Sequence, residues 1–224
     1  MQKITTCFTA LAFSCTFLLS CGEEAPSGDN ATITEEQQAA DAQGQSYAVD
    51  TADSRIRFVG HGVGKNHPGT FRISSGSVSV ADNQITGGSF IIPISSMDME
   101  EEGEMIDGKL RPHLMSGDFF DAEKFGNAKF EITSVVPYEQ NDSDTSIVDG
   151  ANFRISGNFT LKDVTKNISF PARVDLDGNT LKAKGNFDID RTQWQMNYRS
   201  DKSLGDKFIS EKVNIELDLK ASKQ

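Results

Sequence analysis

The sequence has 224 residues and a net charge of −11, from 33 acidic and 22 basic side chains. Nucleic-acid binding depends on Lys and Arg side chains that neutralise phosphates, so a chain this acidic is not expected to have a nucleic-acid partner. The length favours one folded domain with a shorter extension.

The first residues have the pattern of a bacterial secretion signal. Lys3 precedes a charge-free, mostly apolar run up to Leu19, which is shorter than the roughly 20 residues that span a bilayer. The run ends in Ser20 and Cys21, and this ending resembles the lipobox of bacterial lipoproteins. The resemblance implies that residues 1–20 are a lipoprotein signal peptide and that Cys21 becomes the lipid attachment site. The alternative is an ordinary signal peptide with Cys21 incidental.

Cysteine usage agrees with this interpretation. The three cysteines are Cys7, Cys15 and Cys21, so the mature chain would have no intrachain disulfide and no cysteine-based zinc site. Membrane anchoring is stable when more than one acyl chain is attached. We therefore expect the protein in the cell envelope, lipid-anchored through Cys21 to a bacterial membrane, with the periplasmic side and the cell surface both left open.

Residues 21–45 form an acidic segment without aromatic residues, Lys or Arg. Such a composition buries too little apolar surface to become ordered, so we expect a flexible tether that precedes a folded domain over residues 46–221. A short helix over residues 34–43 is the alternative.

The folded part is dominated by alternation of apolar and polar residues. In residues 55–62, for example, Ile56, Phe58 and Gly60 share one face and Arg57 and His61 the other. The same period of two places Phe130, Ile132 and Ser134 together. It predicts β-strands with one dry face. The predicted strands cover residues 55–62, 70–80, 85–95, 130–135, 152–162, 168–176, 181–189 and 212–220.

Short connections between these strands favour antiparallel pairing, and eight such strands can form a barrel or a sandwich. The one long connection, from Ser96 to Asn127, has helix-compatible spacing, with Pro112 in a first turn or at a break. Some inward positions are small, which favours a cavity; a filled core with glycines at bends is the alternative. These small positions are Gly60, Gly157, Ala172, Ala183 and Gly185.

Several segments together resemble one family. They are "YAVDTADSRIRFVGHG", "KLRPHLMSGDFFDAEKFGNAKFEITSV", "ISGNFTLKDVTKNISFPARV" and "FDIDRTQWQMNY". They are similar to the YceI-like, polyisoprenoid-binding family over about residues 47–219. The resemblance implies an all-β fold, an eight-stranded antiparallel lipocalin-like barrel with a short helical segment in the long connection. It also implies an apolar tunnel that holds an isoprenoid chain such as a polyprenyl lipid or a quinone tail.

The family resemblance makes the inward aromatic and aliphatic residues candidates for the tunnel lining. Phe119 and Phe120 are adjacent, so we expect one to point inward and the other to pack on the wall. Trp194 either lines the mouth or packs, and Asp190 with Arg191 forms an ion pair or hydrogen-bonded clasp. The candidates are Phe58, Phe71, Phe90, Ile92, Phe119, Phe120, Phe130, Phe159, Phe187 and Trp194.

We therefore expect a membrane-tethered carrier or sequestering protein rather than an enzyme, with a non-covalent isoprenoid lipid as ligand and no other cofactor. No catalytic residue and no metal ligand is assigned. The sequence leaves a protein partner open, a homodimer included. The alternative function is a metal-dependent protein or hydrolase that uses His61, His67 and His113, which are the three histidines of the chain.

Overall fold

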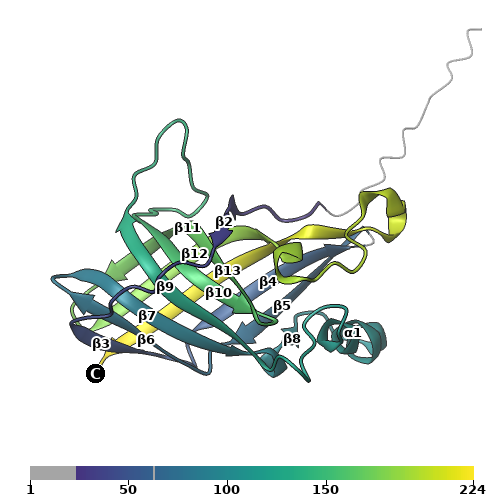
Figure 1. Ribbon diagram of the computed structural model, residues 1–224, viewed down its shortest axis with the longest axis horizontal. Helices are drawn as coiled ribbons and strands as arrows, with labels where there is room; N and C mark the ends of the chain where they lie inside the picture. The colour runs from purple at the N-terminus through teal and green to yellow at the C-terminus, as the bar shows by residue number, and fades with distance from the viewer. Residues whose placement is uncertain (1–23, 63) are drawn as a thin grey trace, which may run out of the picture.

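The computed structural model describes residues 24–62 and 64–224. They form a closed antiparallel barrel of eight long strands, as expected, with one short α-helix outside it (Figure 1). The strands are β1 (Asp29–Asn30), β2 (Thr32–Glu35), β3 (Gln45–Val49), β4 (Arg55–Gly62), β5 (Lys65–Arg72), β6 (Ser75–Ala81), β7 (Gln84–Pro93), β8 (Asp98–Met99), β9 (Asn127–Pro137), β10 (Phe153–Leu161), β11 (Val164–Leu176), β12 (Thr180–Asp190) and β13 (Ile209–Lys223).

The barrel closes because β13 pairs with β12 on one side and with β3 and β4 on the other. The remaining neighbours follow the order β12-β11-β10-β9-β7-β6-β3. Both β3 and β4 lie along β13, one after the other, and β5 and β6 lie along β4 and β3 in the same way. In the barrel, β3 and β4 together therefore take the place of one long strand, and β5 and β6 together take the place of the next one.

The alternation sets which side chains fill the barrel. In β12 the buried inward residues are Leu181, Ala183, Phe187 and Ile189, with charged residues between them. In β9 the predicted parity is wrong beyond Ile132. The pairing between β9 and β10 shifts by one residue at this point, which is a β-bulge, and a bulge reverses the faces that follow it. Val135 therefore packs against the core while Ser134 is exposed.

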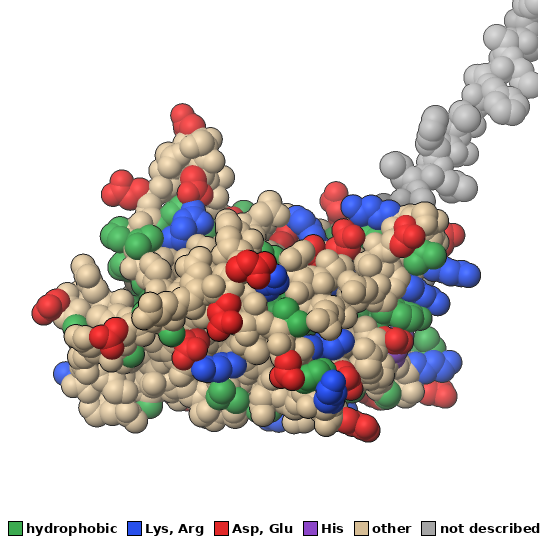
Figure 2. All heavy atoms as spheres, in the orientation of Figure 1, with side chains coloured by type: hydrophobic (Ala, Val, Ile, Leu, Met, Phe, Trp, Pro, Cys, Tyr) green, Lys and Arg blue, Asp and Glu red, His purple; other side chains and the backbone are tan. Residues whose placement is uncertain are grey.

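The long connection between β7 and β9 has the expected helix. It consists of η1 (Ile94–Ser96), β8, η2 (Ile106–Leu110) and α1 (Arg111–Met115), and Pro112 lies in the first turn of α1. The prediction of a single long connection is wrong, because two further long connections are present. Residues 138–152 between β9 and β10 project from the barrel (Figures 1 and 2), and η3 (Arg191–Trp194) and η4 (Lys202–Lys207) separate β12 from β13.

The segment before the barrel differs most from its prediction. Residues 28–44, which we call the strap, run along the barrel and contribute β1 and β2, which pair with β12 and β11 (Figure 1). The backbone N–H of Gln37 donates to Asn158 at 3.0 Å, and that of Ala40 to the carbonyl of Ile132 at 3.0 Å. The predicted flexible tether is wrong for these residues, and no helix forms over residues 34–43. The physical reason is that strands and side chains far along the chain satisfy the strap backbone.

The outer surface carries the charges. Figure 2 shows acidic and basic side chains interspersed over the visible face. Exposed large hydrophobic residues in the described part of the chain are Met105, Val136, Ile147 and Leu204. Within residues 24–62 and 64–224, no helix has both the length and the apolar character to cross a membrane.

Candidate functional site

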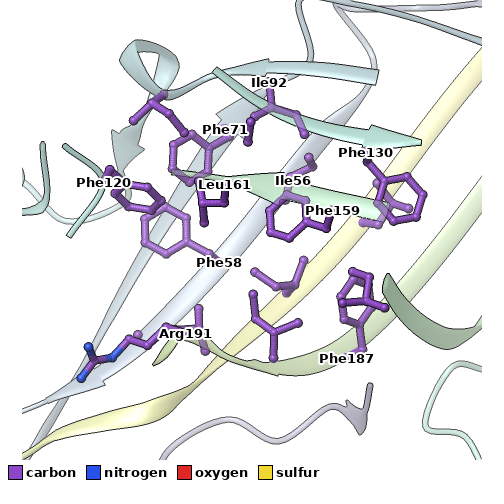
Figure 3. A pocket seen from close by; sticks show the side chains of 18 of the residues that line it. Ile56, Phe58, Phe71, Ile92, Phe120, Phe130, Phe159, Leu161, Phe187 and Arg191 are labelled. Carbon is purple, nitrogen blue, oxygen red and sulfur yellow. The ribbon is translucent and has the colours of Figure 1, made fainter. Parts of the chain in front are cut away.

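A cavity of about 390 Å³ occupies the interior of the barrel. Its walls come from the inward face of the long strands and from the connection between β7 and β9, and almost all of the lining is apolar (Figure 3). Its volume falls in the range of small-molecule sites, about 300–1,000 Å³. Most of the predicted candidates line it, namely Phe58, Phe71, Phe90, Ile92, Phe119, Phe120, Phe130, Phe159 and Phe187.

Aromatic rings form two groups on the cavity wall. Phe71 lies 5.1 Å from Phe58 and 5.5 Å from Phe120, measured between ring centroids. Across the opposite wall, Phe170 stacks on Phe187 at 3.9 Å. Rings held against one another in these geometries gain about 0.5–1.5 kcal/mol per pair beyond their burial. The wall is therefore built from side chains that support each other and leave the centre of the barrel free.

Trp194 is the candidate that the structure places elsewhere. Its side chain is fully buried but does not line the cavity. The indole packs against Phe159, with ring centroids 5.3 Å apart, and its Nε1 donates to the carbonyl of Phe159 at 3.0 Å. Trp194 thus holds η3 onto β10 from behind a lining residue, and it is a packing residue.

Phe119 and Phe120 both line the cavity, so the expected division into one inward and one wall residue is wrong. They differ in their neighbours. Phe119 is buried against His113, Tyr198 and the guanidinium of Arg191. Phe120 is only partly buried and makes an edge contact with Phe71. Both residues lie in a turn rather than in a regular helix, and the backbone there allows both rings to face inward.

Two inward glycines have different consequences for the cavity. A Cβ atom added at Gly157 would collide with the ring of Phe130, so this glycine accommodates a neighbouring side chain. A Cβ atom added at Gly60 would meet no atom within 4 Å, and Gly60 lines the cavity. The expected lateral room therefore exists at Gly60 and is already filled at Gly157.

Polar groups gather at one end of the cavity, which we call the mouth. It is bordered by His61, His67, His113, Tyr198, Arg199 and Ser210. The histidine rings have separate partners. His61 is 2.8 Å from Asn66, His113 is 2.8 Å from Asp118, and His67 is 3.4 Å from Glu101. Among the described residues, no three His, Cys, Asp or Glu side chains are close enough together to hold a metal ion. His61 was expected on the outer face, yet it reaches the rim where β4 ends.

Arg191 is the site residue whose role the sequence did not reveal. It is 3% exposed and lines the cavity near the mouth (Figure 3). Its guanidinium donates to the carbonyls of Ser210 (2.8 Å), Tyr198 (3.0 Å), Ile209 (2.9 Å) and Met196. Burial lowers the pKa of Arg191, while the charges of Asp190 and Glu211 act in the opposite direction.

The expected clasp between Asp190 and Arg191 is wrong in its partners. The carboxylate of Asp190 instead accepts from the backbone N–H of Thr192 at 2.9 Å and caps η3. Arg191 binds backbone carbonyls of the segment that follows, so it ties the end of β12 to the start of β13. The sequence shows an arginine directly after a predicted strand. This pattern does not indicate that backbone carbonyls are its hydrogen-bond acceptors.

The predicted lipid attachment site, Cys21, lies outside the described residues, as does the predicted signal peptide. The first described residue, Glu24, lies at the mouth. Its carbonyl accepts from Nδ2 of Asn66 at 2.9 Å, and Asn66 belongs to β5 beside the rim residue His61. The described part of the chain therefore begins at the end of the barrel where the cavity carries its polar groups.

Comparisons with known proteins agree with this architecture. Residues 47–221 match the family model of the YceI-like domain. UPF0312 protein VPA0850 of Vibrio parahaemolyticus is 29% identical over 141 residues, which is 62% of this chain and 67% of that protein.

Two solved structures share the fold. BcnA of Burkholderia cenocepacia superposes with a TM-score of 0.61 at 20% identity, over 78% of this chain and 99% of that one. A polyisoprenoid binding domain from Saccharophagus degradans, implicated in plant cell wall breakdown, superposes with a TM-score of 0.58 at 15% identity, over 80% of this chain and 99% of that one. At these identities the likeness concerns the fold.

Proposed function

The chain belongs to the YceI-like domain family, and from this premise we propose that its barrel binds a long apolar isoprenoid-type lipid, such as a polyprenyl chain or a quinone tail. The observation that carries the proposal is the cavity, which is apolar along its length and polar at the mouth. The Saccharophagus domain of the same fold, described as polyisoprenoid binding, supports the choice of ligand class.

The lining matches the chemistry of such an amphiphile. Far from the mouth the cavity ends among Val78, Leu181 and Leu219, which offer no polar group to a ligand. Burying apolar area contributes about 25 cal/mol per Å², so a long hydrocarbon tail needs no charged contact there. A polar headgroup would lie among the histidines, Tyr198 and Arg199 at the mouth. We expect weak selection of chain length, because one methylene contributes only about 1–3 kcal/mol in an apolar pocket.

We further propose that the protein works in the cell envelope, tethered to a bacterial membrane by a lipid on Cys21, and acts as a carrier or store. Glu24, hydrogen-bonded to Asn66 at the mouth, is three residues from Cys21 in the chain. The contour of three residues is at most about 11 Å. An anchor at Cys21 would thus keep the mouth close to the membrane that contains the ligand.

Narrowing the cavity without disturbing the fold tests the proposed binding. Gly60→Val adds a side chain where the cavity is empty, and a β-branched residue suits a strand. We expect unchanged or higher thermal stability and at least about tenfold weaker binding of a prenyl lipid, a loss of about 1.4 kcal/mol. The measurement is native mass spectrometry of the protein titrated with a prenyl lipid in detergent.

Ser77→Val is the matched control, because it adds the same side chain on the outer face of β6, where the inward neighbour is Val78. This variant should bind like the parent protein. Equal affinity in Gly60→Val and in the parent would place the lipid outside the cavity and contradict the proposal.

A further inference from the structure

The barrel wall has a seam between β11 and β12. These strands pair with each other only over residues 172–176 and 181–185. Towards the mouth they separate and take other partners. Residues 166–169 of β11 pair with β2, and residues 187–188 of β12 pair with β1. At this position β11 and β12 alone therefore do not close the barrel wall.

The strap fills the seam. Asp29 is the register partner of Phe187 in β12, and Ile33 is the partner of Ile168 in β11. The strap runs parallel to β12 and antiparallel to β11, so residues 29–35 are inserted between the two strands as an additional, short strand segment of the wall. Ala31 and Ile33 pack against the core.

The seam borders the cavity directly. Four lining residues belong to the separated parts of the two strands, namely Ile168, Phe170, Phe187 and Ile189. Behind the strap, the stacked rings of Phe170 and Phe187, 3.9 Å apart, form the inner layer of the closure. The strap and one pair of rings are thus what separates the cavity from the outside along this line.

The strap is held mainly by polar contacts. Oδ1 of Asp188 accepts from the backbone N–H of Gly28 at 2.9 Å, and Nδ2 of Asn158 donates to the carbonyl of Gln37 at 2.6 Å. Both Ala31 and Ile33 are only partly buried, and the other residues of β2 are exposed. Segments with few buried apolar contacts open at low free energy while the rest of a fold stays intact. The family domain begins at residue 47, so the strap lies outside it.

We propose that the seam between β11 and β12 is a side portal of the cavity and that the strap is its displaceable cover. A hydrocarbon tail passes sideways between Phe170 and Phe187 when the strap lifts, while the polar headgroup stays in water near the mouth. The headgroup then never crosses the apolar interior, which would cost free energy for every polar group left without a partner. The portal rests on the proposed function, since it serves the same lipid.

A reversible latch tests the portal. Thr32 and Ser169 are register partners across the strap and β11, and the sequence has no cysteine after Cys21. In the full chain carrying Thr32→Cys and Ser169→Cys, oxidation should slow uptake and release of a fluorescent prenyl lipid from phospholipid vesicles by about tenfold or more, because local opening is then blocked. Reduction should restore both rates. Ile33→Ser, which weakens the strap contact, should accelerate both.

The control joins Ser89 and Glu131, register partners of β7 and β9 in the continuous wall, through Ser89→Cys and Glu131→Cys. Its oxidation should leave the rates unchanged. Equal rates in the oxidised latch, the control and the parent would show that the lipid passes through the mouth and would overturn the portal. Absence of lipid binding in the parent protein itself would instead overturn the proposed function, and the portal with it.

Discussion

Arg191 shows how a single buried cation can organise the mouth of the cavity. Backbone carbonyls at the two ends of the segment 196–210 accept the N–H groups of its guanidinium. The planar fork of arginine suits such a set, whereas lysine offers a single ammonium. Its charge also faces the ring of Phe119 at 5.7 Å. The residue therefore fixes the loop that borders the mouth.

Replacing this side chain should cost stability. Arg191→Met leaves one buried and three partly buried backbone carbonyls without their guanidinium donor, and a buried polar group left unpaired costs about 1–3 kcal/mol. We expect the free energy of unfolding in urea to fall by about 3 kcal/mol or more, as the sum of these losses. Arg173→Met is the control, because Arg173 forms an exposed pair with Asp175 at 2.9 Å, and such pairs contribute about 0–1 kcal/mol. Similar losses in both variants would contradict the structural role of Arg191.

The inward glycines allow a second comparison at the scale of a residue. Gly157→Ala forces the ring of Phe130 to move, and overpacking of this kind costs about 1–3 kcal/mol. Gly60→Ala meets open space and should change the free energy of unfolding by less than about 1 kcal/mol. Thermal unfolding of the two variants checks this. A smaller loss for Gly157→Ala than for Gly60→Ala would show that the rings are not placed as described.

At the scale of an element, the connection between β7 and β9 carries two neighbouring rings, Phe119 and Phe120. We expect substitution of the first to lower mainly the stability of the fold and substitution of the second to weaken mainly lipid binding. Phe119→Ala removes a buried ring that contacts His113, Tyr198 and Arg191 and should lower the free energy of unfolding by about 3–5 kcal/mol. Phe120→Ala removes a half-buried ring on the cavity side and should mainly weaken lipid binding. Chemical denaturation and lipid titration of both variants measure the difference. The same loss of stability in both, with unchanged lipid binding, would reduce the segment to packing.

Local alternation predicted most strands of the barrel, because period two records which face is dry. It missed β3 and merged the end of β5 with β6 into one predicted strand over residues 70–80. The bulge in β9 escaped it, since the extra residue follows from the pairing of β9 with β10 and leaves no local mark. The strap escaped for the same reason on a larger scale. Its composition is that of a disordered segment, yet Asp188 accepts from Gly28 across 160 positions of sequence. The alternation predicts correctly that Phe58 and Phe187 point into the cavity, because both lie in strands. Trp194 lies in the short helix η3, where an alternation of period two does not tell which way a side chain points.

At the scale of the molecule, the proposed anchor, the mouth and the seam lie on the path of one segment. The chain leaves the mouth at Glu24, passes Asp188 with Gly28, and covers the seam with residues 29–35. A lipid on Cys21 would therefore be joined directly to the cover of the cavity. With such an anchor, membrane attachment would be connected to access for the ligand.

The anchor itself is testable. In a bacterial host that processes lipoproteins, the parent protein should appear in the membrane fraction and carry a diacylglyceryl group on Cys21, detected by mass spectrometry of the N-terminal peptide. Cys21→Ser should abolish that modification, and a version with a conventional signal peptide should be recovered without it in the soluble periplasmic fraction. An N-terminus found at another residue, without lipid, would contradict the proposed anchor.

The most direct test of the central claim is to identify what the barrel carries when it is purified gently from bacterial membranes. Extraction of the bound material followed by mass spectrometry should detect an isoprenoid lipid with the parent protein, and much less of it with Gly60→Val, whose cavity is narrowed at residue 60. Recovery of the parent protein without any lipid, together with no uptake of prenyl lipids in vitro, would contradict the assignment of the cavity as an isoprenoid-binding site.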